Sequence, residues 1–392
     1  MRVLRLLHVV PSIGPARGGP SFVVRVLARS QAELGLDVHL ATTDDNGVGR
    51  IPRPLNLPLV EDGVKLWIFP RQTRFYNCSF PLTRWLWKHS GEFDVIHVHA
   101  LFSYASLVGA ILARRAGVPY ILRPHGTLST WGMKHRRPWL KNLSFRLIES
   151  SLLKHAEAVH YSTEQEAAEA EQWGQRHELL VAPNPVELYE DSRRIVPRSA
   201  TFSGRTVVLF LSRIDPIKGL DLLLPAFARV RRNHPAAVLM IAGDGDPEFV
   251  ASMRQQSTSL GLDDGILWTG FVAAEEKRAA FRDADLFVLP SYSENFGVAV
   301  VEAMAAGLPV IVSEGVGIHN MISEAQAGLV IKCSVDDLAA ALDRALSDAG
   351  LRRRMGANGA ELAKRFEPRA VALQLSRFYE RIREKRRDQT AA

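Results

Sequence analysis

Two carboxylates stand eight residues apart late in the sequence, at Glu294 and Glu302. Small and turn-forming residues around Glu294 place it just before a short helix, and Glu302 falls about a turn and a half inside that helix. Gly297 and Val298 lie at the helix start, where unpaired N–H groups and the helix dipole favour a phosphate. The spacing therefore suits a diphosphate with a sugar on each side. An ordinary packed helix that ends at Gly307 is the alternative.

The flanking segments favour the ligand-binding interpretation. Residues 286–289 are apolar and typical of a buried strand before the helix, and residues 309–312 are typical of another strand after it. A strand, loop, helix, strand order places Glu294 at the carboxyl edge of a parallel sheet. Ligands bind at this edge in open α/β proteins.

A basic pair follows the first strand expected in the second half of the chain. Arg213 and Lys218 come directly after the apolar residues 206–211, and Gly219 opens an amphipathic helix. Arginine can bind two phosphate oxygens and lysine acts as a point charge, so both can stabilise the negative charge on a departing diphosphate. Simple surface cations are the alternative in a chain with 49 Lys and Arg.

These two motifs resemble those of family 4 of the retaining glycosyltransferases, the glycosyl transferases group 1, closely over the second half of the chain and loosely over the first. The resemblance implies an α/β protein of the GT-B fold, in which two Rossmann-like domains with parallel sheets face each other across a cleft. It implies that Glu294 meets the transferred sugar and that Glu302 binds the ribose hydroxyls of the nucleotide. The further donor-binding residues that we expect around this helix are Asn295, Phe296, Gly297 and Val298, with backbone contacts to the base near Phe271.

The first half of the chain offers two further candidate segments. Gly18 and Gly19 follow the first expected strand, and a glycine pair lets free N–H groups approach a ligand, although many such loops are plain turns. His125 follows a buried strand, where an imidazole can donate to a sugar hydroxyl or cap a turn. By resemblance, the glycines lie near the donor diphosphate and the acceptor, and His125 lies beside the donor sugar with a catalytic role.

Some residues match patterns of metal sites. His97 and His99 share one face of an expected strand, but no third ligand is evident, so we expect a structural or acceptor-side role for His99. Asp244 to Asp246 and Asp283 to Asp285 match the Asp-x-Asp pattern of metal-dependent transferases of another fold. Because the basic pair already supplies positive charge, we predict transfer without a metal or other cofactor.

Short apolar runs alternate with helical patterns along the chain, which predicts parallel sheets covered on both faces. The strands expected in the first half are 3–10, 38–42, 66–69, 95–99, 120–123, 158–161 and 179–182, and those in the second half are 207–212, 238–242, 266–269, 286–289, 310–312 and 329–331. Residues 187–205 lack a periodic pattern and indicate a linker. We expect an acceptor domain over 1–190, a nucleotide-sugar donor domain over 200–366, and an amphipathic helix over 367–392, which by resemblance crosses back to the first domain.

Composition agrees with a soluble globular protein: 47% of the residues are hydrophobic and 23% are charged. No apolar stretch is long enough to span a bilayer, and the apolar opening at residues 3–10 carries Arg5 and His8 and lacks a cleavage site for a secretory signal. Only Cys78 and Cys333 are present, which favours a reducing compartment. We therefore expect a cytoplasmic protein.

Basic charge is concentrated in the first half of the chain. Residues 95–148 hold eight Lys or Arg and no Asp or Glu, with Trp131 and Trp139 between them. Such a segment suits an anionic membrane surface that carries a lipid-linked acceptor, at the inner face of the membrane. Nucleic acid and a merely solvated surface are the alternatives, and no nucleic-acid motif accompanies the segment.

The function expected from these features is transfer of a hexose from a nucleotide-diphosphate-sugar to a glycan or polyprenyl-linked acceptor, in surface polysaccharide or glycolipid synthesis. The resemblance implies retention of the anomeric configuration by front-side attack. A non-catalytic nucleotide-sugar or dinucleotide-binding module is the alternative. The spacing of Gly14, Gly18 and Gly19 does not match a dinucleotide fingerprint.

Overall fold

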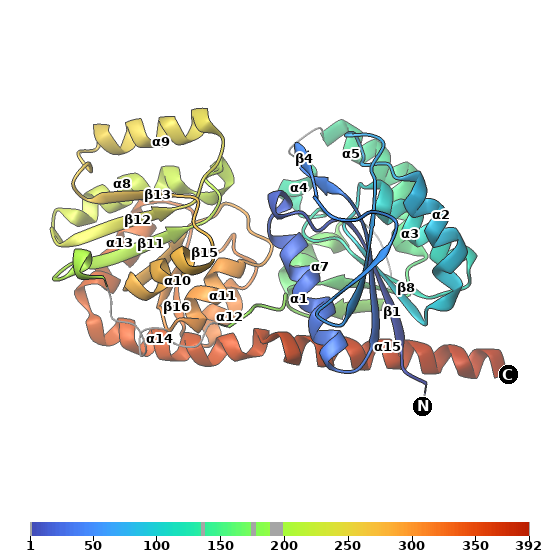
Figure 1. Ribbon diagram of the computed structural model, residues 1–392. Helices are drawn as coiled ribbons and strands as arrows, with labels where there is room; N and C mark the ends of the chain where they lie inside the picture. Colours follow the sequence, from blue (N-terminus) through green and yellow to red (C-terminus); the bar gives the residue numbers. More distant parts are fainter. Residues whose placement is uncertain (1, 135–137, 174–177, 189–198, 392) are drawn as a thin grey trace. The chain divides into compact units, whose positions relative to one another are not determined.

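The computed structural model describes residues 2–134, 138–173, 178–188 and 199–391. The chain forms two compact units, each with its own sheet (Figure 1). Unit 1 comprises Met1–Pro185 and Pro368–Ala392, and unit 2 comprises Val186–Glu367. Most of the linker expected over 187–205 falls on residues 189–198, which lie outside the described residues.

Unit 1 is built on a sheet with the strand order β10-β9-β8-β7-β1-β2-β6-β5. Its neighbouring strands are parallel except for β5, which runs antiparallel to β6 at the edge. The strands are β1 (Arg5–Ser12), β2 (Asp37–Thr43), β5 (Pro58–Glu61), β6 (Val64–Phe69), β7 (Val95–His99), β8 (Tyr120–Arg123), β9 (Ala158–Tyr161) and β10 (Glu178–Val181). A separate antiparallel ribbon joins β3 (Asp45–Asn46) and β4 (Gly49–Arg50).

Unit 2 is built on a parallel sheet with the order β13-β12-β11-β14-β15-β16. Its strands are β11 (Thr206–Leu211), β12 (Ala237–Ala242), β13 (Ile266–Gly270), β14 (Leu286–Leu289), β15 (Val310–Ser313) and β16 (Gly328–Ile331). The order of the strands reverses between β11 and β14, and this switch point is where open α/β sheets bind ligands.

The predicted α/β class and every predicted strand are confirmed, with ends that differ by at most two residues. The short strands β3, β4 and β5 were not predicted, because segments of two to four residues carry too little periodicity.

Helices cover both sheets. Those of unit 1 are α1 (Gly19–Glu33), α2 (Phe80–His89), α3 (Tyr104–Arg115), α4 (Thr130–Lys134), α5 (Pro138–Ser144), a π-helical turn (Phe145–Glu149), α6 (Ser150–Lys154), α7 (Glu164–Glu171) and α15 (Pro368–Ala391). Those of unit 2 are α8 (Leu220–Arg231), α9 (Pro247–Ser259), α10 (Ala274–Asp283), α11 (Val298–Ala305), α12 (His319–Glu324), α13 (Val335–Ser347) and α14 (Ala349–Ala363). Within the described residues, no helix has the length and apolar character that crossing a membrane requires.

The two faces of the unit 1 sheet carry different residues. Leu7, Ile96 and Leu122 belong to a purely apolar core on one face. On the other face, apolar residues of β1, β7, β8 and β9 pack against Leu375 and Phe378 of α15, and α15 lies against α1 (Figure 1). Because side chains alternate along a strand, this second face also receives the histidines of β1 and β7.

Candidate functional site

The loops that follow β11 and β14 meet at the switch point of unit 2. The Tyr292 amide donates a hydrogen bond of 2.8 Å to the carbonyl of Ile217, which ties one loop to the other. Gly219 adopts φ +71°, and a Cβ at this position would lie 2.1 Å from the carbonyl oxygen of Pro290. Glycine is therefore required here, because a side chain would separate the two loops.

Lys218 and Glu294 form a partly buried ion pair at this junction, with 9% of the Lys218 side chain and 22% of the Glu294 side chain exposed. Lys218 lies in the single 3₁₀ turn Pro216–Lys218 after β11, and its Nζ donates to Oε2 of Glu294. The backbone of Glu294 is fixed on both sides, since its amide donates to Gly315 and its carbonyl accepts from Gly317, each at 2.8 Å. The structure thus brings together two residues that the sequence placed 76 positions apart.

The Glu294 carboxylate is stabilised in its charged form. Burial acts to raise its pKa, but the charge and hydrogen bond of Lys218, together with the backbone amides of Phe296 and Gly297, lower the pKa below the ordinary value of 4.5. The prediction of a free amide at Gly297 is therefore wrong, because this amide binds Glu294. The amide of Val298, the first residue of α11, lies where an intrahelical acceptor is lacking.

Glu302 forms a second partly buried ion pair, with Lys277, which was not predicted from the sequence. Nζ of Lys277 in α10 donates to Oε1 of Glu302, whose side chain is 3% exposed. The other oxygen, Oε2, is buried and has no hydrogen-bond partner among the described residues. Burial raises the pKa of Glu302 above 4.5 in spite of Lys277. Lys277 carried no sequence signal, because a cation within a polar helix looks like any solvated residue.

The other predicted residues of unit 2 have different environments. Arg213 is 68% exposed, and its Nη1 lies 3.9 Å from Oδ2 of Asp215, so it does not contact the buried pairs. Phe271 is exposed, and Asn295 is half-buried. The side chain of Phe296 packs edge-on against Phe366 in the core, with ring centroids 5.5 Å apart. A donor contact through the Phe296 side chain is therefore ruled out, because that side chain is buried.

The aspartates of the two Asp-x-Asp segments have structural partners. Asp246 caps α9 by accepting from the amides of Glu248 and Phe249, each at 3.2 Å. Asp285 accepts from the amide of Val207 at 2.8 Å, which aligns the start of β11. Asp283 accepts from Nε of its neighbour Arg282 at 2.9 Å.

Unit 1 has a cavity of about 230 Å³ next to the glycine loop. Its lining includes Pro11, Ser12, Arg17, Pro20, His99 and His125. Gly18 and Gly19 lie at the start of α1 with open space beside them. The prediction that both N–H groups are free is wrong for Gly18, whose amide donates to the carbonyl of Pro15 at 3.1 Å.

The predicted histidines lie together in unit 1. His125 adopts φ +54°, and its Nε2 lies 3.1 Å from Nδ1 of His99. No third metal ligand beside His97 and His99 was evident from the sequence, but His8 of β1 lies opposite His97 in the sheet. These three side chains form a group of the type that can hold a metal ion.

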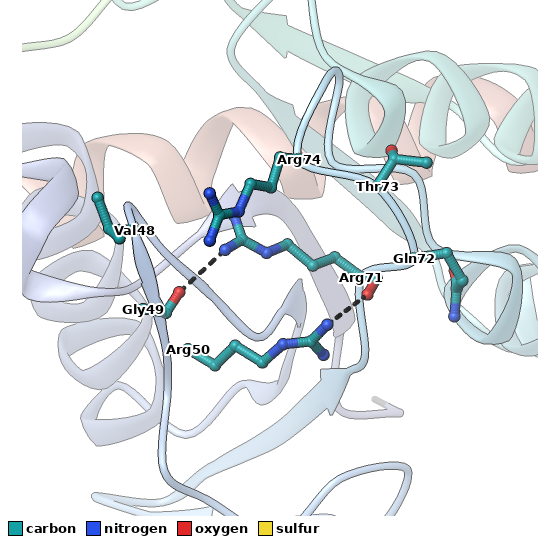
Figure 2. Close-up of a pocket in the computed structure, with 7 residues that line it drawn as sticks. All are labelled: Val48, Gly49, Arg50, Arg71, Gln72, Thr73 and Arg74. Carbon is teal, nitrogen blue, oxygen red and sulfur yellow. Dashed lines mark hydrogen bonds between the residues drawn. The ribbon is translucent and has the colours of Figure 1, made fainter.

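A second hollow of unit 1, of about 180 Å³, is rich in arginine (Figure 2). Arg50, Arg71 and Arg74 line it. Arg71 donates to the carbonyl of Gly49 at 3.0 Å, and Arg50 donates to the carbonyl of Arg71 at 3.2 Å. This hollow was not predicted from the sequence, because its arginines come from a two-residue strand and from a loop without a recognisable motif.

Only part of the basic segment 95–148 is exposed at the surface. Arg123 is buried and donates to Asn184, and residues 135–137 of the segment lie outside the described residues. Trp131 is half-buried. Trp139, Leu143 and Leu147 are exposed and recur every four residues along α5 and the following π-helical turn, with Trp139 and Leu147 each 71% exposed. The segment therefore presents an apolar stripe as well as basic charge.

Family descriptions match both halves of the chain. Residues 18–185 match the Glycosyl transferase 4-like domain, and residues 191–362 match Glycosyl transferases group 1. A phosphatidyl-myo-inositol mannosyltransferase of Mycobacterium leprae is 32% identical over 307 residues, which cover 76% of this chain and 75% of the relative. The GDP-mannose:cellobiosyl-diphosphopolyprenol alpha-mannosyltransferase of Komagataeibacter xylinus is 27% identical over 394 residues, which cover 97% of this chain and 93% of the relative.

Solved structures share the architecture. Sucrose-phosphate synthase of Thermosynechococcus elongatus matches with a TM-score of 0.76 at 22% identity, covering 97% of this chain and 99% of that one. Anabaena HepE in complex with UDP-glucose matches with a TM-score of 0.76 at 20% identity, covering 96% of this chain and 99% of that one. With both halves matched and a relative above 30% identity, the chain belongs to the group 1 glycosyltransferases and has the GT-B fold.

Proposed function

We propose that the protein is a retaining, metal-independent hexosyltransferase that moves a hexose from a nucleotide-diphosphate-sugar to a glycan or lipid-linked acceptor. The partly buried Lys218–Glu294 pair at the carboxyl ends of β11 and β14 carries this proposal. A lysine and a carboxylate fixed at a switch point match the needs of a substrate with an anionic leaving group and a polar sugar.

We assign the nucleotide to the neighbourhood of Glu302. Its oxygen Oε2 is buried and has no hydrogen-bond partner among the described residues, so a hydroxyl group of a ribose would satisfy it. Lys277 holds the other oxygen and thereby orients the carboxylate. HepE was solved with UDP-glucose, and the Komagataeibacter relative is named for GDP-mannose, which supports a nucleotide-diphosphate-hexose as the donor. The N–H group of Val298 at the tip of α11 supports a nearby diphosphate.

The transfer breaks the bond between the anomeric carbon and the diphosphate oxygen, and it forms a bond from the acceptor hydroxyl to the same carbon. Lys218 and Arg213 stabilise the charge that develops on the departing phosphate, which makes a metal ion unnecessary. The departing phosphate oxygen takes the proton of the acceptor hydroxyl from the same face. Because Lys218 and two backbone amides already bind Glu294, we assign this carboxylate to positioning the sugar rather than to nucleophilic attack.

We assign the acceptor to unit 1 and the donor to unit 2, with residues 1–190 and 200–366 as the two domains. The apolar stripe of Trp139, Leu143 and Leu147 beside basic residues supports peripheral contact with an anionic membrane at its cytoplasmic face. The names of the relatives above include phosphatidyl-myo-inositol and a diphosphopolyprenol, which supports a lipid-linked acceptor in glycolipid or surface polysaccharide synthesis.

A panel of nucleotide-sugars tests this proposal. Slow hydrolysis of one donor is expected in the presence of a chelator, with the anomeric configuration of the first-formed sugar followed by NMR. Retention of configuration supports the proposal, whereas inversion or a strict metal requirement contradicts it. A non-catalytic binding module, the alternative, would bind a nucleotide-sugar without hydrolysing it or transferring its sugar to any acceptor offered.

A further inference from the structure

A continuous series of buried polar groups crosses the face of the unit 1 sheet that α1 and α15 cover. It runs from the carbonyl of Ala182 to the cavity at His125, and we call it the hydrogen-bond chain. In order, its members are Ala182, His160, His97, Tyr379, Gln31, His8, His99 and His125. All the side chains between the two ends are fully buried, so their donors and acceptors must match one another.

The carbonyl of Ala182 fixes the direction at one end. It lies 2.8 Å from Nε2 of His160, and because a carbonyl can only accept, Nε2 must carry the hydrogen. A neutral imidazole has one donor and one acceptor, so Nδ1 of His160 accepts from Nε2 of His97 at 3.3 Å. Nδ1 of His97 is then an acceptor as well.

Tyr379 and Gln31 transmit this direction from β7 to β1. The Tyr379 hydroxyl lies 2.8 Å from Nδ1 of His97 and must donate to it. The phenolic oxygen can then accept from Nε2 of Gln31, which lies at 3.3 Å. This contact turns the amide oxygen of Gln31 toward His8.

The last three rings continue in the same direction. Nε2 of His8 lies 2.7 Å from Oε1 of Gln31 and must donate to it. Nδ1 of His8 then accepts from Nε2 of His99 at 2.9 Å, and Nδ1 of His99 accepts from Nε2 of His125 at 3.1 Å. His125 lines the cavity. Its Nδ1 carries no hydrogen in this arrangement, and the hydrogen bond that its ring forms among the described residues uses Nε2.

The environment of the rings keeps them neutral, as this assignment requires. Burial lowers the pKa of His8 to about 4, and it lowers the pKa of His97 and His99 well below 6.5, with further repulsion from neighbouring rings. Burial and the charge of Arg123 also lower the pKa of His125 and His160. A proton added to Nδ1 of His8, His97, His99 or His160 would set two donors against each other with no acceptor between them, and it would interrupt the chain.

A metal ion at His8, His97 and His99 is the competing use of these residues. The ring nitrogens of His8 and His99 that face each other are 2.9 Å apart, and a metal at either nitrogen would break their hydrogen bond. The buried guanidinium of Arg123 acts on all of these rings and disfavours a further cation among them. The geometry therefore favours the hydrogen-bonded arrangement.

We infer that the hydrogen-bond chain holds His125 in the Nε2–H tautomer, so that its bare Nδ1 accepts a hydrogen bond from a sugar hydroxyl in the unit 1 cavity. This inference rests on the proposed function only for the identity of the ligand. It reverses the role expected from the sequence, in which the imidazole donates. Gln31, Tyr379 and His160 become positioning residues, which act on the sugar only through His125.

Ring ¹⁵N–¹H correlation spectra of the full chain labelled with ¹⁵N-histidine test the assignment. The ligand-free protein is expected to show His8, His97, His99, His125 and His160 with hydrogen on Nε2 and none on Nδ1. Hydrogen on Nδ1 of His125, or metal in the purified protein that shifts the rings of His8, His97 and His99, would overturn the inference. The tautomers are read without substrate, so a protein that shows them but transfers no sugar refutes the proposed function and not the chain.

Substitution of Gln31 tests whether the chain sets the tautomer. Gln31→Met removes the acceptor of His8, and a buried N–H without a partner costs more than an unused lone pair. His8, His99 and His125 are then expected to shift their hydrogen to Nδ1, while His97 and His160 keep theirs on Nε2, because Ala182 and Tyr379 still direct them. Gln255→Met is the matched control, because Gln255 is an exposed residue of α9 in unit 2, outside the hydrogen-bond chain, and its substitution should leave all five rings unchanged.

Two outcomes of these experiments would refute control of His125 by the chain. The first is a Gln31→Met protein that is folded and still carries hydrogen on Nε2 of His125. The second appears when the free hexose of the donor hydrolysed in the panel is added: its binding in the unit 1 cavity should shift the Nδ1 resonance of His125 while Nε2 keeps its hydrogen. A switch of that hydrogen to Nδ1 would show that His125 donates to the sugar.

Discussion

At the switch point of unit 2 the ionisable groups pair their charges, whereas unit 1 combines ion pairs with buried groups that stay neutral. Unit 2 pairs charges: Lys218 with Glu294 and Lys277 with Glu302. Unit 1 also pairs buried charges, Arg71 with Asp45, but it keeps the histidines of the hydrogen-bond chain neutral and raises the pKa of the buried Glu149 to about 7. Both arrangements avoid an isolated buried charge, which costs several kcal/mol.

The difference follows from what each unit is proposed to bind. A diphosphate that departs with extra negative charge needs fixed cations, and a lysine held by a carboxylate remains charged in a buried site. Hydroxyl groups of sugars are neutral, and oriented neutral acceptors can position them without attracting ions. Unit 2 is therefore proposed to combine cations for the departing phosphate with carboxylates that hold hydroxyls, whereas the hydrogen-bond chain of unit 1 offers a neutral acceptor.

Removing the cation of the first pair should have the largest effect. Lys218→Met is expected to lower kcat for donor hydrolysis by roughly 100- to 1000-fold, because one preorganised charge at the leaving group is lost. Lys364→Met is the control, since Lys364 is an exposed residue of unit 2 that pairs with Glu361. Equal rates in the two variants, with thermal unfolding showing both folded, would remove Lys218 from the mechanism.

The neutral state of Glu149 can be measured through stability. Its carboxylate is buried, accepts from the Phe102 amide at 3.2 Å, and leaves Oε2 without a partner among the described residues. A folded-state pKa of about 7 against 4.5 means that its stabilising contribution is complete below pH 4.5 and is lost as the pH rises through 7.

Glu149→Gln removes this titration. At pH 8 the variant is expected to be more stable than the native protein by about 3 kcal/mol, the size of the pKa difference, and at pH 4.5 the gain should vanish. Urea unfolding at both pH values measures it. Exposed Glu361→Gln should change stability little at either pH, and a Glu149 variant with the same flat profile would show that Glu149 is charged in the folded protein.

Substitution of Glu302 tests whether the Lys277–Glu302 pair contributes to donor binding. Glu302→Gln is expected to weaken donor binding by roughly 10- to 100-fold, because a charged hydrogen bond to a hydroxyl is lost, with a smaller effect on kcat. Calorimetry with the donor measures the dissociation constant. Lys277→Met should weaken binding less, as it acts only by orienting Glu302. A kcat defect without a change in affinity would place Glu302 at the reacting sugar instead.

The exposed apolar stripe should matter only for the acceptor. Trp139→Ala is expected to reduce binding to anionic vesicles by about 10-fold, the effect of losing one partly inserted aromatic side chain. Donor hydrolysis in solution should stay unchanged, since the substitution leaves unit 2 intact. Vesicle sedimentation and the hydrolysis assay together separate the two roles, and unchanged sedimentation would exclude Trp139 from membrane contact.

Much of the fold was predictable because its signals are local. The apolar runs of β11 and β14 are contiguous, and the turn residues around Glu294 lie beside it in the sequence. The periodicity of short segments therefore gave the strands and the loops that carry Lys218 and Glu294. Phe296 shows the limit of this reasoning, because a residue between two predicted ligand groups turned out to be part of the core.

The sequence by itself determined where the strands lie along the chain and which loops hold candidate groups, because neighbouring residues encode periodicity and turns. Only the tertiary structure decided which groups meet. Lys277 reaches Glu302 from a separate helix, and His97 reaches Tyr379 across 282 positions. Such contacts leave no pattern along the chain, because packing of whole elements brings them together. The charge of Glu302 and the tautomer of His125 therefore depend on partners that the sequence does not mark.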